Sequence, residues 1–184
     1  MSIRAIFLDR DGVINHNHGY VHKRDNFDFI DGIFDLSRCA HEKNYRLVVI
    51  TNQSGIGRGY FSEHQFHRLT DWMCQQFTSI GAPITRVYFS PYHPTAGLGR
   101  YKRDDFSRKP HPGMILQAKE DLSLDLKRSV LIGDKVSDIQ AGVAAGVGTN
   151  LLFGSGRPTA LEDINYEVIS TLNEAIPYLQ RKAQ

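Results

Sequence analysis

The chain has 184 residues, and its 22 lysines and arginines nearly balance its 20 aspartates and glutamates, which leaves a formal charge of +2. Apolar residues make up 41% and charged residues 23%, an ordinary globular composition that excludes collagen-like and intrinsically disordered chains. The length predicts one domain spanning residues 1–184. Since there is no polybasic block, the composition gives little support to a nucleic-acid or membrane partner.

Apolar periodicity predicts strands and helices that alternate along the chain, and therefore a parallel sheet with helices on both faces. Residues 90–110 interrupt this alternation with three prolines, two glycines and many charges, and they predict a long loop insertion. In chain order we expect a strand at 5–8, a helix at 33–43, a strand at 47–50, a helix from a capping box at Ser62 through Phe77, a strand at 87–89, a helix at 112–122, a strand at 129–132, a helix at 138–145, a strand at 149–153 and a helical tail at 171–179.

The two cysteines, Cys39 and Cys74, lie far apart in the sequence. This pattern is typical of reduced thiols and fits neither a disulfide framework nor a clustered zinc site. The first apolar run is too short for a signal peptide, and no run approaches the roughly 18 apolar residues of a membrane span. We therefore expect a cytoplasmic protein, and we expect it to be a monomer.

Polar side chains follow the predicted strands. Asp9-Arg10-Asp11-Gly12 follows the first strand, Thr51-Asn52 the second, Arg108-Lys109 the insertion after the third, and Gly133-Asp134 the fourth. Because ligands of open α/β sheets bind beyond the carboxyl ends of the strands, we expect these groups to meet at one edge. Carboxylates suit Mg²⁺, and phosphoryl transfer requires mainly positioning and charge neutralisation. The pattern therefore predicts a phosphoryl-transfer site.

The two carboxylates after the first strand can divide this chemistry between them. Asp9 can attack phosphorus and carry the phosphoryl group as an aspartyl phosphate. Asp11 can protonate the leaving oxygen and later deprotonate the attacking water. Each feature alone has a simpler explanation, since an isolated Asp-x-Asp is commonly a solvated turn and Lys109 by itself is a surface lysine. The combination, in this order after successive strands, favours the catalytic interpretation.

These four segments resemble the four motifs of the haloacid dehalogenase superfamily of phosphatases. Longer segments, among them residues 18–22, 51–56 and 108–114, are similar to the heptose 1,7-bisphosphate phosphatases of that superfamily, and the similarity runs from about Ile6 to Gly148. The resemblance implies a Rossmann-like, three-layer α/β fold with a central, mostly parallel sheet and no large cap domain. It also implies a Mg²⁺-dependent phosphatase that removes the C7 phosphate of the bisphosphate through an aspartyl phosphate, for nucleotide-heptose and surface polysaccharide synthesis.

The resemblance implies a role for each matching residue. Asp9, Asp11 and Asp134 would bind Mg²⁺, with Asp11 contributing its backbone carbonyl. Thr51 and Lys109 would hold the transferring phosphoryl group. Asp138 is expected to orient Lys135 or its loop and not to bind metal. The other residues expected to bind substrate are Asn17, His18, Gly19, Tyr20, Asn52, Gln53, Ser54, Arg108 and Lys135, the last two near the sugar or its second phosphate.

The chain departs from many of these relatives in its insertion, where they hold a structural zinc with Cys-x-His and Cys-x-Cys. The corresponding segments here are Ser90-Pro91-Tyr92 and Asp105-Phe106-Ser107, so all four ligand positions differ. We therefore predict that structural zinc is absent. Without the metal, the loop must be held by aromatic packing or by hydrogen bonds, or it must move. A small apolar cluster could replace the metal, and its members would be Tyr88, Phe89, Tyr92, Tyr101 and Phe106.

Several alternatives remain open. A histidinol-phosphate phosphatase or a broader sugar-phosphate phosphatase would use the same chemistry. A non-catalytic phosphate-binding protein is less favoured, because Asp9, Asp11, Lys109 and Asp134 are all present. The segment 55–59 resembles a phosphate cradle, but a flexible turn explains it equally well. The expected partner is a small phosphorylated sugar, and neither a nucleic acid nor a membrane.

Overall fold

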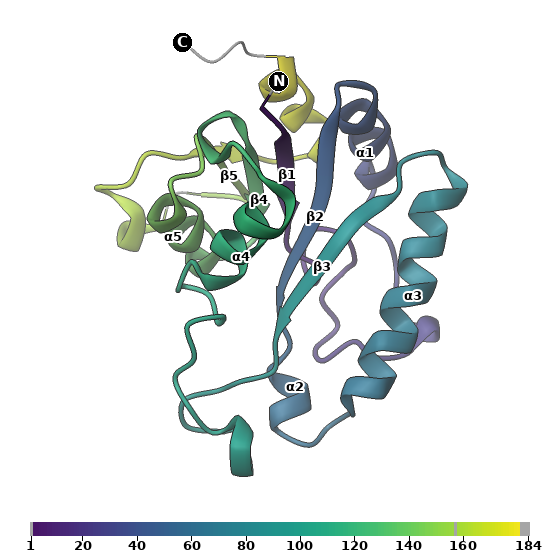
Figure 1. Cartoon of the computed structure of the whole chain (residues 1–184), viewed down its shortest axis with the longest axis vertical. Helices are drawn as coiled ribbons and strands as arrows, with labels where there is room; N and C mark the ends of the chain where they lie inside the picture. The colour runs from purple at the N-terminus through teal and green to yellow at the C-terminus, as the bar shows by residue number, and fades with distance from the viewer. Residues whose placement is uncertain (1, 157, 181–184) are drawn as a thin grey trace.

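A computed structural model describes residues 2–156 and 158–180. Its centre is a six-stranded sheet of order β3-β2-β1-β4-β5-β6, in which every pairing is parallel (Figure 1). The predicted α/β fold with a central parallel sheet is therefore confirmed. The strands are β1 (Arg4–Leu8), β2 (Tyr45–Asn52), β3 (Ile84–Ser90), β4 (Val130–Gly133), β5 (Thr149–Phe153) and β6 (Glu167–Ile169).

Helices cover both faces of the sheet and make three layers. Helices α1 and α3 lie on one face, and α4 and α5 lie on the other (Figure 1). The α-helices are α1 (Ile33–Glu42), α2 (Ser54–Gly57), α3 (Glu63–Ser79), α4 (Gly113–Leu122) and α5 (Val136–Ala145). Short 3₁₀ segments are η1 (Arg24–Asn26), η2 (Gly99–Tyr101), η3 (Leu126–Arg128), η4 (Thr159–Leu161) and η5 (Leu172–Gln180).

The alternation of side chains along the strands divides the core into two main clusters. In β1, Ile6 and Leu8 face the layer that contains α1 and α3, whereas Ala5 and Phe7 face α4 and α5. All four side chains are fully buried. The central strands therefore have no solvated face, which explains why their sequences are continuous apolar runs.

The structure corrects the sequence predictions at three places. The three-residue strand β6 was not predicted, because Glu167–Ile169 is too short to show periodicity. The tail predicted at 171–179 is helical, but it is the 3₁₀ helix η5, with Pro177 inside it. The segment 55–59, left open between a phosphate cradle and a flexible turn, begins within the short helix α2, which spans Ser54–Gly57. The capping box that begins α3 at Ser62 is confirmed.

The strand order places the chain's polar segments at one edge. Strand β1 lies between β2 and β4, with Leu8 paired to Val49 on one side and to Ile132 on the other. The residues that follow β1, β2 and β4 consequently emerge side by side. The insertion between β3 and α4 also lies at this end of the sheet, near α2 (Figure 1). In the described part of the chain, no helix has the length and apolar character needed to cross a membrane.

Candidate active site

Three aspartates bring their carboxylates together at this edge. Asp9 follows β1, Asp134 follows β4, and Asp138 lies in the first turn of α5. One oxygen of each carboxylate lies within 4.8 Å of the others. Asp9 and Asp138 are buried, whereas the side chain of Asp134 remains 21% exposed. The strand-end argument predicted that Asp9 and Asp134 would meet, and the structure places them within reach of one shared cation.

The ammonium group of Lys109 links two of these carboxylates. Its Nζ donates to the carbonyl of Ile50 at 2.9 Å and lies 3.0 Å from Asp9 Oδ1 and 2.6 Å from Asp138 Oδ1. All three ammonium protons therefore have partners, in a side chain that is only 2% exposed. Asp138 Oδ2 accepts a hydrogen bond from the backbone N–H of Lys135 at 2.9 Å. The sequence argument connected Asp138 to Lys135 but missed its ion pair with Lys109.

The centre carries more negative than positive charge. Its three carboxylates face two ammonium groups, those of Lys109 and of Lys135, whose Nζ lies 3.4 Å from Asp134 Oδ1 and 4.0 Å from Asp9 Oδ2. Burial raises the pKa of Asp9 to about 7; the charge of Lys109 opposes this rise, and that of Asp138 adds to it. Burial also raises the pKa of Asp134. A bound cation would compensate this excess of carboxylate charge.

Lys109 remains charged in this buried position. Burial works to lower its pKa, but the charges of Asp138 and Asp9 outweigh burial and hold the pKa of Lys109 above its usual range. An ammonium group fixed against Asp9 in this way is suited to stabilising negative charge on a phosphoryl group.

The backbone after β1 passes very close to Asp134. Gly12 has φ +104°, and a Cβ on this residue would lie 2.2 Å from Asp134 Oδ2. Only glycine combines this φ with this approach. The loop from Asp9 to Gly12 therefore lies directly beside the Asp134 carboxylate. Two carboxylates and a neighbouring backbone are hard oxygen donors of the kind that Mg²⁺ prefers, so this donor set fits that ion.

The side chain of Asp11 is held by three neighbours. Arg10 contacts both of its oxygens, at 2.9–3.2 Å, and Asn15 and Gln53 donate to it at 3.1 and 2.9 Å. Arg10 is only 1% exposed, and its Nη2 also donates to the carbonyl of Val21 at 2.6 Å. This arginine thus ties Asp11 to the segment that follows residues 17–20. The roles of Arg10 and Asn15 were not predicted, because nothing in the sequence around either residue indicates that its side chain contacts Asp11.

The end of β2 contributes the hydroxyl group of Thr51 and a side chain, that of Asn52, that binds the backbone of Lys109. Gln53 Nε2 donates to Thr51 Oγ1 at 2.8 Å, so the hydroxyl proton of Thr51 remains available to a ligand. The side chain of Asn52 accepts from the N–H of Lys109 and donates to its carbonyl, both at 3.0 Å. Asn52 therefore fixes the backbone of Lys109 to β2, a function that its sequence position did not indicate.

A cavity of about 240 Å³ opens beside Asp11. It gathers most of the residues predicted to bind substrate, from three separate segments of the chain. Gly55 was not among those predicted; it belongs to α2, where a Cβ would lie 2.3 Å from Phe61. The lining residues are Asp11, Asn17, Gly19, Tyr20, Asn52, Gln53, Ser54, Gly55 and Lys135.

Four of the residues predicted to bind the substrate or its phosphoryl group do not line this cavity. His18 points to Asp28, with Nε2 2.8 Å from Oδ2, and both side chains are more than half exposed. Arg108 is half-buried, and its Nη1 donates to the carbonyl of Tyr92 at 3.1 Å. Thr51 and Lys109 are buried and also do not line it. The structure therefore separates the predicted residues into a reacting centre, a cavity and two outlying side chains.

The four insertion positions that the sequence predicts to lack zinc ligands, Ser90, Tyr92, Asp105 and Ser107, lie in a cluster of polar and cation–π contacts. Ser107 Oγ donates to Asp105 Oδ1 at 2.7 Å and lies 3.0 Å from Ser90 Oγ, within hydrogen-bonding distance. Asp105 also pairs with Arg103, at 2.7 Å, and the guanidinium of Arg103 stacks 4.1 Å from the ring centroid of Tyr92. We call these five residues the loop clip. The clip joins the end of β3 to the last part of the insertion.

The predicted aromatic cluster is wrong as a single unit. Tyr88 and Phe89 are consecutive in β3 and point to opposite faces of the sheet, so they cannot pack together. Phe89 packs on Phe66, with ring centroids 4.5 Å apart, and Phe106 is 60% exposed. Only Tyr92 and Tyr101 approach each other, at 6.1 Å. The polar contacts of the loop clip correspond to the other expectation, that hydrogen bonds hold the loop.

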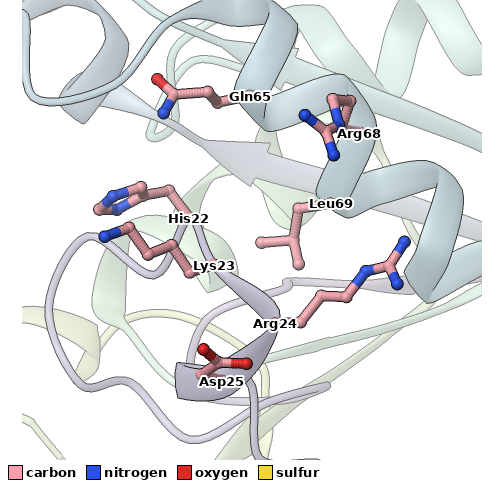
Figure 2. Close-up of a pocket in the computed structure, with 7 residues that line it drawn as sticks. All are labelled: His22, Lys23, Arg24, Asp25, Gln65, Arg68 and Leu69. Carbon is pink, nitrogen blue, oxygen red and sulfur yellow. The ribbon is translucent and has the colours of Figure 1, made fainter.

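A second hollow, of about 400 Å³, lies between α3 and the segment that includes η1 (Figure 2). Three of the seven side chains that line it are cationic, and none of the seven was predicted to belong to the site. It adjoins the substrate segment, since His22 Nδ1 lies 2.8 Å from the carbonyl oxygen of Tyr20. The residues that line it are His22, Lys23, Arg24, Asp25, Gln65, Arg68 and Leu69.

Comparisons with known proteins agree with this architecture. The HAD-hydrolase-like family model matches residues 106–175. A putative HAD-like phosphatase from Mesorhizobium loti superposes with a TM-score of 0.85 at 30% identity, covering 100% of this chain and 90% of that one. D,D-heptose 1,7-bisphosphate phosphatase from B. bronchiseptica, solved with magnesium and phosphate, gives a TM-score of 0.80 at 25% identity, covering 96% and 98%. Fold and site together define a hydrolase of the haloacid dehalogenase type.

Proteins with similar sequences show to which family of this superfamily the chain belongs. D-glycero-alpha-D-manno-heptose-1,7-bisphosphate 7-phosphatase of Burkholderia mallei is 52% identical over 97% of this chain and 95% of its own length. The corresponding beta-named enzyme of Escherichia coli K12 is 44% identical over 100% and 98%. The chain therefore belongs to the heptose-1,7-bisphosphate 7-phosphatase family of the haloacid dehalogenase superfamily. The predicted enzyme class, a phosphoric monoester hydrolase, is confirmed.

Proposed function

We propose that this protein is a Mg²⁺-dependent phosphatase that removes the C7 phosphate of D-glycero-D-manno-heptose 1,7-bisphosphate. The observation that carries the proposal is the buried carboxylate of Asp9, held 3.0 Å from Lys109 Nζ and beside Asp134. Relatives that are 44–52% identical are named for this activity. The product would serve the assembly of nucleotide-activated heptose for surface polysaccharide.

The proposed metal ligands are Asp9, Asp134 and the backbone carbonyl of Asp11. Both oxygens of Asp138 already have partners, in Lys109 and the N–H of Lys135, so this carboxylate is left out of the set. Mg²⁺ held by these residues would supply positive charge that offsets the negative charge of the carboxylates and of the phosphoryl group and so lowers their mutual repulsion. A relative of the same fold is complexed with magnesium and phosphate, which supports this choice of ion.

The proposed reaction has two displacement steps at phosphorus. In the first, a carboxylate oxygen of Asp9 forms a bond to phosphorus while the bond to the sugar oxygen breaks, and Asp11 gives that oxygen a proton. In the second, Asp11 takes a proton from a water molecule, which attacks phosphorus and releases Asp9 and inorganic phosphate. Lys109 and the hydroxyl of Thr51 stabilise the charge on the phosphoryl oxygens in both steps.

The network around Asp11 supports its proposed role. Arg10, Asn15 and Gln53 hold its side chain in one place at the edge of the cavity, next to the loop of Asp9. A group that both gives and takes a proton must keep its position through two steps, and three hydrogen-bonding neighbours provide that restraint.

The remaining parts of the proposal concern the protein's surroundings. We propose a monomeric, cytoplasmic enzyme that acts on a small phosphorylated sugar and has no nucleic-acid or membrane partner. The near-neutral charge and the two unpaired cysteines support this assignment. We also propose that the insertion contains no structural zinc, because its four ligand positions are Ser90, Tyr92, Asp105 and Ser107.

A substrate panel tests the proposal. The kcat/KM values should be compared, with Mg²⁺ present, for both anomers of the heptose bisphosphate, fructose 1,6-bisphosphate and histidinol phosphate. One heptose anomer is expected to be the best substrate, while a preference for histidinol phosphate would overturn the assignment. Asp9→Asn should retain the fold and lose turnover, because an amide does not attack phosphorus. Wild-type rates in this variant would exclude the covalent mechanism.

A further inference from the structure

Arg58 and Arg108 come from distant parts of the chain but lie near each other. Arg58 ends helix α2, and Arg108 precedes Lys109 at the end of the insertion. The insertion packs directly on the end of α2: the N–H of Leu98 donates to the carbonyl of Gly57 at 2.7 Å. A Cβ on Gly57 would lie 2.3 Å from the carbonyl oxygen of Pro91, so glycine permits this contact. The fold thus places Arg58 and Arg108 near enough for their positive charges to interact.

Neither guanidinium group forms an ion pair with a carboxylate in the described part of the chain. Burial lowers the pKa of Arg108, and the positive charge of Arg58 lowers it further. Asp104 is near enough to offset part of this effect, but its carboxylate pairs with His111 at 3.2 Å. Two positive charges held near each other without an ion-paired carboxylate are typical of an anion-binding site.

Unused hydrogen-bond donors strengthen this interpretation. Arg58 Nε is buried and has no partner in the described structure. A buried donor without a partner is costly to a folded protein, and a bound anion would supply the missing acceptor. Arg108 uses Nη1 to bind the carbonyl of Tyr92, which fixes the orientation of its guanidinium. One arginine is therefore anchored, and the other retains donor capacity.

Tyr20 connects this pair to the substrate cavity. The guanidinium carbon of Arg58 lies 5.9 Å from the centroid of the Tyr20 ring, and Tyr20 lines the cavity together with Asp11 and Lys135. Lys135, in contrast, points its ammonium toward Asp9 and Asp134 at the reacting centre. The cavity therefore has one cationic group at the reacting end and a pair of arginines beyond Tyr20.

We propose that Arg58 determines specificity by binding, together with Arg108, the phosphate that the enzyme retains on its substrate. This proposal rests on the proposed function, in which a bisphosphate loses only one phosphate. Two guanidinium forks match the charge and the oxygen geometry of a phosphate dianion. Lys135 was expected near the sugar or its second phosphate; its contacts with Asp9 and Asp134 lead us to propose that it faces the transferred phosphoryl group.

The test compares bisphosphates with a monoester that lacks a second phosphate. Arg58→Ala and Arg58→Lys should be assayed on heptose 1,7-bisphosphate, fructose 1,6-bisphosphate and p-nitrophenyl phosphate. Arg58→Ala is expected to lower kcat/KM for both bisphosphates about 10- to 100-fold, mainly through KM, because charge-assisted hydrogen bonds are lost. Its rate on p-nitrophenyl phosphate should stay within about twofold of wild type. Arg58→Lys keeps the positive charge but lacks the two-pronged guanidinium group. Its kcat/KM for the bisphosphates should therefore lie between those of Arg58→Ala and the wild type.

Arg68→Ala provides a matched control, since it removes the same charge from an exposed position on α3. It should leave all three substrates unchanged. Equal losses on bisphosphates and monoester, or no loss on either, would overturn the role of Arg58. If the wild-type enzyme prefers fructose 1,6-bisphosphate to the heptose, the proposed substrate is wrong. A selective loss of bisphosphate activity in Arg58→Ala would still support the retained-phosphate site in that case.

Discussion

Replacing Asp138 tests whether this carboxylate positions Lys109. In the structure Asp138 is 1% exposed and supplies one of the two carboxylates that neutralise the buried ammonium group. Its other oxygen caps the N–H of Lys135 at the start of α5. Asp138→Ala removes both interactions at once. Asp138→Asn has nearly the same shape and keeps an oxygen acceptor, but it carries no charge.

The structure sets the scale of the expected effect. Removing one partner of a buried ion pair costs about 3–5 kcal/mol, and Lys109 keeps two other acceptors, so the lower end applies. Loss of the helix cap adds about 1 kcal/mol. Asp138→Ala should therefore be destabilised by about 4 kcal/mol, and Asp138→Asn by about 2 kcal/mol. The kcat on p-nitrophenyl phosphate should fall about 100-fold in Asp138→Ala, because Lys109 then pairs with Asp9 alone.

The assay combines urea unfolding with Mg²⁺ titration of the phosphatase rate. Asp35→Ala is the matched control, because that aspartate forms an exposed ion pair with Arg38 and should cost less than about 1 kcal/mol. The reasoning is refuted if Asp138→Ala has wild-type stability and rate. It is also refuted if Asp138→Asn keeps its stability but needs much more Mg²⁺ for half-maximal activity, since Asp138 would then be a metal ligand.

Three further predictions address other parts of the site. Gly12→Ala should lose activity and about 1–3 kcal/mol of stability, because its Cβ would lie 2.2 Å from the Asp134 carboxylate. The control is Gly81→Ala, which also has a positive φ, +78°, but whose Cβ would have no atom within 4 Å; this variant should remain active. Ser107→Ala should lower the unfolding free energy by about 1–2 kcal/mol, because the loop clip loses hydrogen bonds to Ser90 and Asp105; an unchanged urea midpoint would contradict this. Purified enzyme should contain no stoichiometric zinc and, after chelation, should recover full activity with Mg²⁺ alone. One tightly held zinc per chain would contradict the last prediction.

The reacting centre was predictable because backbone topology alone determines where strand ends lie. Once 5–8, 47–50 and 129–132 are identified as parallel strands, Asp9, Thr51 and Asp134 must emerge at the same edge. No knowledge of side-chain packing is needed for that step. The insertion follows the third predicted strand, so the same strand-end rule also placed Lys109, at the end of the insertion, among the residues of the reacting centre.

The supporting contacts could not be predicted, because they depend on side chains that meet only in the folded state. Nothing in its own position shows that Asn52 clamps the backbone of Lys109, or that Asp138 pairs with the ammonium group. From the sequence, Arg10 is simply a charged residue in an acidic loop. In the structure it is buried and forms an ion pair with Asp11. The nearness of Arg58 to Arg108 depends on how the insertion docks, and no local pattern encodes that docking.

The clamp between Asn52 and Lys109 has a consequence for how such enzymes diversify. It secures the last stretch of the insertion to a central strand, independently of whatever holds the rest of that segment together. The contacts of the loop clip lie upstream of Lys109 and are separate from the two hydrogen bonds that fix its backbone to β2. We therefore expect sequence differences in the outer part of the insertion to leave the position of Lys109 unchanged.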